Sequence, residues 1–172
     1  GTADQLTLAD FSNTVTLTGV ESLVAGTGND VVTLSVAQTA GNYDMGAGTD
    51  RLVLATAGNN TLTVANAETI VGAGGVDTIT VTAGQTGTRI DLGSMNDTLI
   101  LSNDDNDFTA LNVETITGGT GADIVTMGAA IIGTTNFNLG DGADQLRLFN
   151  ATNTFTLMSN TITHSARIAT VT

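Results

Sequence analysis

The sequence predicts an all-β fold in which the chain winds into a parallel β-helix or β-roll solenoid of about seven coils. Three observations support this prediction. The chain repeats itself, glycine-rich loops that end in aspartate recur at fixed positions, and apolar residues alternate with polar ones between the loops. No stretch of useful length shows the 3.6-residue period of an amphipathic helix.

Two families of glycine-rich loops interleave along the chain. The first family aligns without gaps over residues 21–34, 68–81 and 114–127, and its loops end at Asp30, Asp77 and Asp123, which are 47 and 46 residues apart. The second aligns over 43–54, 90–101 and 137–148, with loops ending at Asp50, Asp97 and Asp144, and residues 1–8 form a truncated member ending at Asp4. Such self-similarity is typical of solenoids.

The seven loops are alternately about 20 and 26 residues apart, and such regular spacing is the mark of a stacked-repeat architecture. We therefore expect three repeats of 46–47 residues, each making two coils, and one partial repeat. Residues 1–172 would form a single continuous domain that belongs to a larger protein.

The segments between loops have the pattern of strands. After each loop aspartate the second and fourth residues are apolar, as in Val32 and Leu34 or Leu99 and Leu101. This period of two is the signature of a half-buried strand. Because one narrow coil cannot bury its apolar face alone, neighbouring coils must stack, about 4.8 Å apart. Equivalent residues then form ladders, with the loop aspartates in one file along one edge.

Composition narrows the range of partners. Seventeen acidic residues face four basic ones, giving a net charge of −13, which argues against binding to nucleic acid or to an anionic membrane. Aromatic residues are only 3% of the chain and cysteine is absent, so the core is aliphatic and no disulfide is available. No apolar run approaches the roughly 20 residues of a transmembrane helix. This composition fits a secreted bacterial protein with a cationic partner.

A file of aspartates needs a counter-charge. Two carboxylates about 4.8 Å apart repel by roughly 1 kcal/mol in water and more near a protein surface. Calcium suits such a place because it accepts about 6–8 oxygen ligands, including backbone carbonyls, which glycine can turn inward. The loops therefore predict several bound calcium ions.

Two loops carry a family resemblance. GGTGADIVT (118–126) fits the nonapeptide G-G-x-G-x-D-x-U-x, and AGTGNDVVT (25–33) misses only its first glycine. In these loops the chain resembles the calcium-binding RTX repeats of hemolysin-type toxins, large adhesins and S-layer proteins. The resemblance implies a right-handed solenoid. It implies side-chain ligands at Asp4, Asp30, Asp50, Asp77, Asp97, Asp123 and Asp144, and carbonyl ligands at Gly26, Gly28, Gly46, Gly48, Gly119, Gly121, Gly140 and Gly142.

The chain also departs from that family. Ala73 replaces a loop glycine in residues 72–77, and Met95 stands where the second loop glycine of residues 92–97 should be. RTX rolls recur about every nine residues per half-coil, whereas the coils expected here are far longer. In this respect the chain resembles the wider β-helices of surface-layer proteins.

Several acidic groups leave alternatives open. The loops can be read as plain tight turns, which also favour glycine, asparagine and aspartate. Glu21, Glu68 and Glu114, each nine residues before a loop aspartate, either complete a cation site or form one solvated outer ladder, which we favour. Asp141 is an extra candidate ligand. The acidic run 103–107 is either an additional calcium site or a solvated turn.

The leading functional hypothesis is non-enzymatic. We expect a calcium-stabilised structural module of a secreted bacterial surface protein, such as an S-layer, adhesin stalk or extracellular filament, that folds on binding calcium outside the cell. Self-association into a lattice or fibre is expected, and a cell-surface glycan is a candidate partner. One alternative is a polysaccharide-modifying β-helix enzyme, which needs convergent acids and bases. The other is a calcium-dependent ice-binding solenoid, suggested by the threonine-rich segments 14–18, 61–64 and 78–82.

Overall fold

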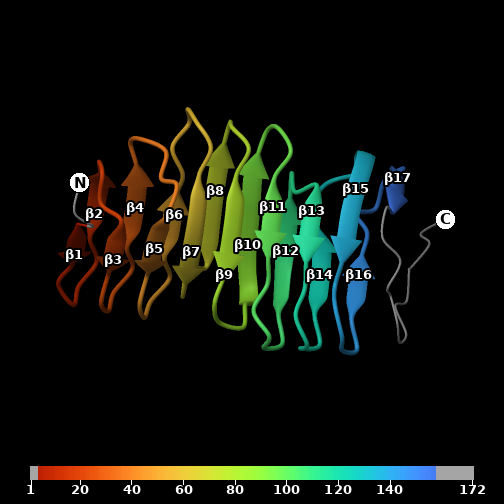
Figure 1. The fold of residues 1–172 in the computed structure, drawn as a ribbon. Helices are drawn as coiled ribbons and strands as arrows, with labels where there is room; N and C mark the ends of the chain where they lie inside the picture. The colour runs from red at the N-terminus through yellow and green to blue at the C-terminus, as the bar shows by residue number, and fades with distance from the viewer. Residues whose placement is uncertain (1–3, 158–172) are drawn as a thin grey trace.

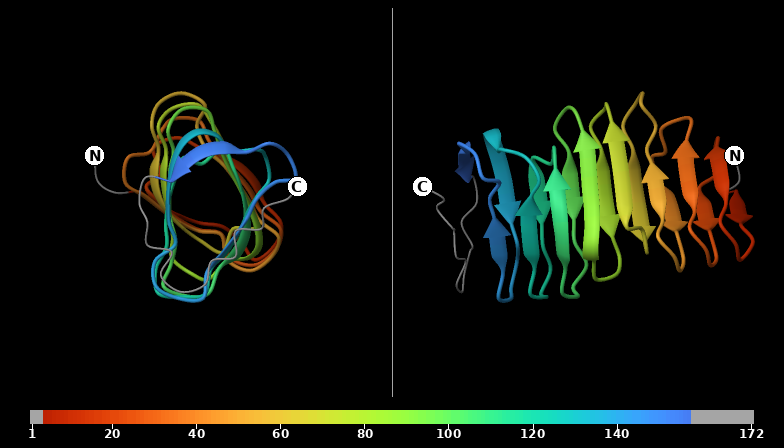
Figure 2. Two further views of the ribbon diagram at one scale, coloured as in Figure 1. Left: turned by 90° about the vertical axis from the view of Figure 1, so that its right-hand side faces the viewer. Right: turned by 180° about the vertical axis from the view of Figure 1, so that it is seen from behind.

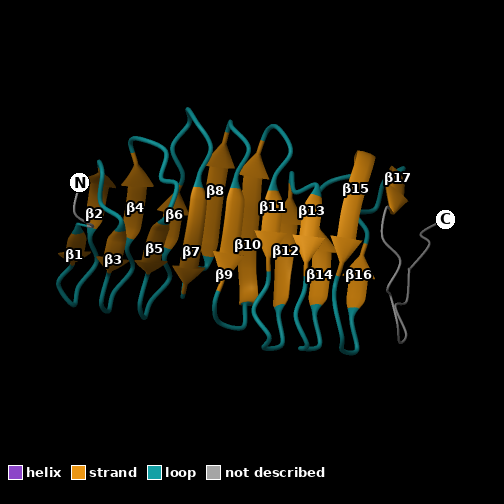
Figure 3. Cartoon of the chain, viewed as in Figure 1, coloured by secondary structure: helices purple, strands orange, loops and turns teal. Residues whose placement is uncertain are grey.

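The predicted all-β solenoid of about seven coils is confirmed (Figure 1). The computed structural model describes residues 4–157, and strands connected by loops make up this whole range (Figure 3). No helix occurs among the described residues, so none there is long and apolar enough to cross a membrane.

The strands alternate between two parallel sheets. Sheet A contains β1 (Gln5–Thr7), β3 (Ser22–Val24), β5 (Gly41–Asp44), β7 (Thr61–Ala65), β9 (Thr78–Val81), β11 (Thr98–Ile100), β13 (Thr115–Thr117), β15 (Ile132–Asn138) and β17 (Thr154–Leu157). Sheet B contains β2 (Thr14–Leu17), β4 (Val31–Leu34), β6 (Arg51–Val53), β8 (Thr69–Ala73), β10 (Thr86–Gly93), β12 (Asp107–Leu111), β14 (Ile124–Met127) and β16 (Gln145–Arg147).

The two sheets define two edges of the molecule. The chain runs along a strand of sheet A, turns, and returns along a strand of sheet B, as the view down the solenoid shows (Figure 2, left). We call the row of turns that lead into sheet A edge A, and the row of turns that lead into sheet B edge B. Every coil therefore contributes one turn to each edge.

The coils are shorter than the sequence predicts. Paired residues in adjacent coils are 17 apart for Gln5 and Ser22, and 22 apart for Ile132 and Thr154. Half a coil is therefore close to the nine residues of an RTX roll, and the expectation of far longer coils is wrong. The sequence predicts one coil for the longer spacing from Asp50 to Asp77. It spans one and a half, because Asp50 precedes β6 and Asp77 precedes β9.

The repeat does not make a whole number of coils. Asp30 precedes β4, Asp77 precedes β9 and Asp123 precedes β14, so each repeat spans five strands, or two and a half coils. The expectation of two coils per repeat is therefore wrong. Because half a coil moves the chain from one sheet to the other, successive repeats place their aspartates on opposite edges. The single file of aspartates along one edge is wrong for the same reason.

The core lies between the sheets and is built by the predicted alternation. Val32, Leu34 and Leu99 are buried, as are nearly all the apolar residues that point inward from the strands. Each such side chain stabilises the fold by about 1.5–3 kcal/mol relative to exposure. The buried ring of Tyr43 keeps its hydroxyl satisfied by donating to the Val20 carbonyl at 2.5 Å. The aliphatic stack thus fixes the turns at both edges.

Candidate metal centre

Three short files of polar residues occupy the turns. In each file, successive coils contribute the residue that immediately precedes a strand, which we call a rung. File 1 on edge B contains Asn13, Asp30, Asp50 and Glu68; file 2 on edge A contains Asn60, Asp77, Asp97 and Glu114; file 3 on edge B contains Asn106, Asp123 and Asp144. On edge A, Asp4 and Glu21 form a partial file at the start of the chain. Six of the seven predicted loop aspartates therefore lie in files 1 to 3, two in each, and the seventh, Asp4, lies in the partial file.

Neighbouring rungs are joined by hydrogen bonds. The backbone N–H of Asp30 donates to Oδ1 of Asp50 at 2.7 Å. The same bond joins Asp77 to Asp97 at 2.7 Å and Asp123 to Asp144 at 3.0 Å. Each aspartate thus uses one carboxylate oxygen to satisfy a buried amide of the preceding coil, a group that is costly to leave unpaired.

An asparagine begins each file. Asn60 donates both its backbone N–H and its side-chain amide to Oδ1 of Asp77, at 2.8 and 2.9 Å. Asn13 and Asn106 bind the first aspartates of files 1 and 3 in the same way. The sequence reasoning missed these residues. Their signal was the spacing of Asn13, Asn60, Asn106 and Asn153, which are 47, 46 and 47 residues apart.

A glutamate ends files 1 and 2. Oε2 of Glu68 accepts the N–H of Asp50 at 2.6 Å, and Oε2 of Glu114 accepts that of Asp97 at 2.8 Å. Glu21 accepts the N–H of Asp4 in the same manner at 2.9 Å. The favoured prediction of one solvated outer ladder is wrong, because the three glutamates alternate between the edges and are partly buried.

In five of the six aspartates of files 1 to 3, the second carboxylate oxygen has no partner among the described residues. Oδ2 of Asp30, Asp50, Asp77, Asp97 and Asp123 is buried and forms no hydrogen bond within residues 4–157. The one ion pair among the described residues joins Arg89 to Asp91 at 2.9 Å, on the outer face of sheet B. A buried polar atom left unpaired costs about 1–3 kcal/mol, and more when it carries charge. The files therefore contain buried carboxylate oxygens that no protein group within residues 4–157 satisfies.

Burial also changes the acidity of the file residues. It raises the pKa of Asp97 to about 6, with a further rise from the carboxylates of Asp77 and Glu114, against the lowering effect of the hydrogen bond from the Asp77 amide. Burial raises the pKa of Asp50 and of Asp123 as well. Ionised files are thus unfavourable by themselves, and either protons or a metal ion would relieve them.

The loop glycines allow adjacent turns to approach very closely. Gly46 has a φ of +84°, and a Cβ there would lie 1.8 Å from the carbonyl oxygen of Gly26. A Cβ on Gly48 would lie 2.1 Å from that of Gly28. In file 3, Gly140 and Gly142 lie equally close to the carbonyls of Gly119 and Gly121. Glycine is therefore required by the contact between turns as well as by the positive φ.

Some of the predicted carbonyl ligands already have a partner. The carbonyl of Gly26 accepts the N–H of Ala47 at 2.9 Å, and the carbonyl of Gly119 accepts that of Asp141 at 2.9 Å. A carbonyl oxygen has a second lone pair, so these bonds leave one acceptor position free.

Two further predicted ligands lie at the margins of the files. Asp141 is exposed beside Gly119, Asn138 and Gly140, which line a surface hollow of about 250 Å³. Asp4 is exposed and belongs to the partial file with Glu21. These two carboxylates would be more hydrated ligands than the buried aspartates.

The acidic run 103–107 forms the turn that begins file 3. Asn106 is its first rung, and Oδ1 of Asp105 accepts the N–H of Ala122 at 2.7 Å. Asp104 and Asp105 are exposed. The run thus corresponds to residues 9–13, which form the turn at the start of file 1. This correspondence favours a solvated turn over a separate ion site.

The donor set fits calcium better than a transition metal. Among residues 4–157, no group of three or more histidine, cysteine, aspartate or glutamate side chains converges on one point. A cation in a file would therefore take one or two carboxylates and complete its shell with carbonyl, amide or water oxygens. Hard oxygen donors in a flexible arrangement are what calcium prefers, and the unpartnered Oδ2 atoms fit that requirement.

Comparison with known proteins assigns no function, so any functional proposal must be argued from the residues described above. No protein-family model matches the chain, and neither a curated protein nor a solved structure does.

Proposed function

We propose that the chain is a calcium-stabilised structural module of a secreted bacterial surface protein, serving as an S-layer element, adhesin stalk or extracellular filament. One observation carries the proposal. Five buried aspartate oxygens lie in files along both edges, and none has a hydrogen-bond partner or a cationic neighbour among the described residues. Bound calcium would satisfy these oxygens and offset the negative charge of the chain, which is −13 in total.

Calcium binding would then be coupled to folding. The aspartates meet across the files only when the coils are stacked, so the ions bind the folded chain and not the unfolded one. Ligand binding of this kind stabilises the fold in proportion to the logarithm of free calcium. Extracellular calcium sites are commonly half-filled near 10⁻⁴–10⁻³ M. The module would therefore remain loose at cytosolic calcium and fold after export.

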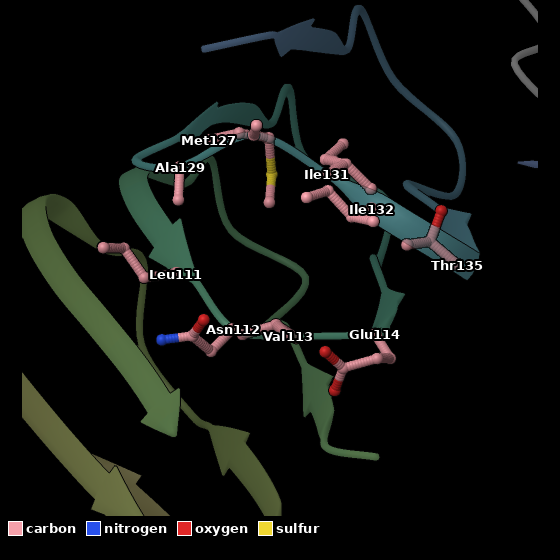
Figure 4. A pocket seen from close by; sticks show the side chains of 10 residues that line it. Leu111, Asn112, Val113, Glu114, Met127, Ala129, Ile131, Ile132 and Thr135 are labelled. Atoms are coloured by element: carbon pink, nitrogen blue, oxygen red, sulfur yellow. The ribbon is translucent and has the colours of Figure 1, made fainter. Parts of the chain in front are cut away.

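A structural role agrees with how the acidic groups are used. Each file aspartate is tied to a backbone amide, and equivalent residues recur from coil to coil, as in a scaffold. The cavity in Figure 4, of about 240 Å³, is lined mainly by apolar residues such as Val113, Met127 and Ile131. Its one carboxylate, Glu114, already accepts the Asp97 amide. General acid–base catalysis needs a second titratable group in the same place.

The test is a comparison of the purified chain with and without free calcium. We expect a β-sheet circular dichroism spectrum in millimolar calcium, loss of most of that signal in EDTA, and recovery when calcium returns. Magnesium at the same concentration should restore less, because it demands a stricter geometry. An unchanged spectrum in EDTA, with no bound metal by elemental analysis, would refute the proposal.

One observation favours ice binding as a second candidate. Thr61, Thr78, Thr98 and Thr115 pair in register across four neighbouring strands of sheet A. Two residues further on, Thr63, Thr80 and Thr117 form a parallel row that Ile100 completes. These side chains face outward and repeat about every 4.8 Å across the strands and about 6.6 Å along them. A regular array of uncharged hydroxyl groups of this kind could match an ordered layer of water.

Thermal hysteresis measures this second function directly. Thr80→Tyr would interrupt the array of sheet A, and Thr33→Tyr is the matched control on the outer face of sheet B. Ice binding predicts hysteresis in the native chain and in Thr33→Tyr, and its loss in Thr80→Tyr. Absence of hysteresis in the calcium-loaded native chain would exclude it.

A further inference from the structure

We infer that the solenoid holds its cations in three separate clusters, one for each repeat, placed alternately on edges B, A and B. Each cluster is centred on one aspartate pair: Asp30 with Asp50, Asp77 with Asp97, and Asp123 with Asp144. This arrangement rests on the proposed calcium binding and adds to it how the sites are divided. The alternative is one continuous row of coupled ions.

The first step is that each cluster has its own unsatisfied donors. Oδ2 is buried and unpartnered in both aspartates of files 1 and 2, and in Asp123 of file 3. In the second aspartate of each pair, Oδ1 accepts a backbone N–H of the same file. No file carboxylate is bridged to another file, so the need for positive charge arises separately in each repeat.

The second step is that neutral residues close the files. Each file begins with an asparagine, which supplies amide donors and no charge. On edge B, the rung between Glu68 and Asn106 is Gln85, whose N–H donates to Oδ1 of Asn106 at 3.1 Å. On edge A, Gln38 precedes Asn60 in the same way, at 3.3 Å. The hydrogen-bonded ladder continues through these rungs, but the charge does not.

The third step is distance. From Glu68 to Asp123 along edge B is three coils, or about 14 Å at the usual strand spacing. Charges separated by more than the Debye length of about 8 Å at physiological salt interact weakly. File 2 lies on edge A, where its rungs precede strands of sheet A, whereas the rungs of files 1 and 3 lie on edge B and precede strands of sheet B. Occupation of one cluster should therefore change the affinity of the next only slightly.

The three files still cover the fold between them. File 1 spans β2 to β8, file 2 spans β7 to β13, and file 3 spans β12 to β16. Neighbouring spans overlap by two strands, so the end of one file lies in the coil where the next begins. Each cluster would lock its own stretch of the solenoid, and the overlaps would join those stretches into one rod.

The experiment removes the central cluster from the whole chain. Asp77→Asn with Asp97→Asn deletes both charges of the aspartate pair in file 2, and Asp91→Asn, a partly buried residue on the outer face of the same coils, is the control. Bound calcium is counted by equilibrium dialysis and elemental analysis, and local order by amide hydrogen exchange. The expected result is loss of about a third of the calcium and of protection in β9 and β11, with the remaining dissociation constants changed less than about twofold.

Other outcomes overturn the cluster arrangement. A tenfold or larger weakening of the remaining sites, or collapse of the whole chain in saturating calcium, would mean that the ions form one coupled row. The pair Asp30→Asn and Asp50→Asn repeats the test from the other edge, and should spare β9 and β11 while exposing β4. If the native chain binds no calcium, the proposed function itself fails. If the native chain binds calcium but the two double variants do not each lose a separate part of it, only the cluster arrangement fails.

Discussion

Files 1 and 2 have the same arrangement of polar residues on opposite edges of the molecule. They differ in their loops. Both run from asparagine through two aspartates to glutamate, with the same hydrogen bonds. In file 1 the second loop has Gly48 at a φ of +154°; in file 2 the equivalent Met95 is held at a φ of +93° and is exposed. The repeat thus preserves the charges and their hydrogen bonds, while the loop backbone keeps a left-handed conformation even where the residue disfavours it.

The comparison teaches that stacking of the coils determines the shape of each turn. A non-glycine residue at positive φ costs about 1–3 kcal/mol and persists only where its surroundings enforce it. The positive φ of Met95 is enforced by the strands on either side of the loop and by the rungs at Asp77 and Asp97. Calcium binding should therefore be weaker at file 2 than at file 1, since part of the binding free energy offsets that strain.

The largest expected effect comes from the contact between turns in file 1. Gly46→Ala places a Cβ 1.8 Å from the Gly26 carbonyl, which forces the two turns apart. We expect a loss of at least about 3 kcal/mol in the free energy of unfolding, measured by chemical denaturation in calcium. Gly87→Ala is the control, since Gly87 also has a positive φ but has no atom within 4 Å of the added Cβ. Equal losses in both variants would show that strain alone, and not turn contact, sets the cost.

The second effect is the pH dependence of the metal-free protein. The pKa of Asp97 is about 6 when folded and 3.8 as a free group, so the folded state holds that proton more tightly between these values. The contribution of Asp97 to stability is then fully present below about pH 4 and is lost as the pH rises through about 6. Because the chain should lose most of its β-sheet signal in EDTA near neutral pH, circular dichroism in EDTA should show that signal partly recovering as the pH is lowered from 7 to 4.

Substitution of Asp97 isolates the part of this pH response that Asp97 contributes. Asp97→Asn should flatten the dependence in EDTA, because it replaces the carboxyl by a neutral amide. With calcium present the trend should reverse, since protons compete with the metal for the same oxygens. A metal-free protein whose stability increases from pH 4 to 7 would contradict the raised pKa of the file aspartates.

The next effect concerns the asparagines that begin the files. Asn60 is wholly buried, whereas Asn13 is partly exposed. Asn60→Ala removes a donor to Asp77 that water cannot replace, and should cost about 2 kcal/mol; Asn13→Ala should cost about 1 kcal/mol or less. Unfolding of both variants in calcium checks the difference. If Asn13→Ala proved the more costly, burial of the first rung would not be the reason for the asparagine.

The smallest expected effect comes from giving the loop of file 2 the glycine that file 1 has at the equivalent position. Met95→Gly removes the penalty of a side chain at positive φ and should stabilise the calcium-loaded chain by about 1 kcal/mol. Met95→Ala keeps the Cβ and is the control, with no gain expected. Calcium titrations of the two variants should also show tighter binding only in the glycine variant. A gain in both would assign the effect to the exposed thioether instead of the backbone.

Much of this organisation was predictable because it is local. The alternation after Asp30 or Asp97, the glycine loops and the six aspartates all follow from short-range patterns, and the structure places them as strands, turns and rungs. The acid-rich composition also directed attention to the loops, where the structure buries the aspartate carboxylates.

The edge of each aspartate was not predictable in the same way. Alignment shows that Asp30 and Asp77 have equivalent neighbours, but both sheets present the same alternation, so equivalence does not reveal which sheet follows. Only the pairing of the strands shows whether each repeat makes two coils or two and a half. The glutamates were misjudged for a related reason, since Glu68 contacts Asp50, a residue 18 positions earlier in the chain.

The central claim is that calcium satisfies the buried, unpartnered aspartate oxygens. A crystal structure of the calcium-saturated chain, with anomalous scattering to identify the metal, tests it most directly. We predict calcium peaks about 2.3–2.6 Å from Oδ2 of Asp30, Asp50, Asp77, Asp97 and Asp123, grouped by file on the two edges. Intact files with no anomalous peak beside those oxygens, at saturating calcium, would contradict it.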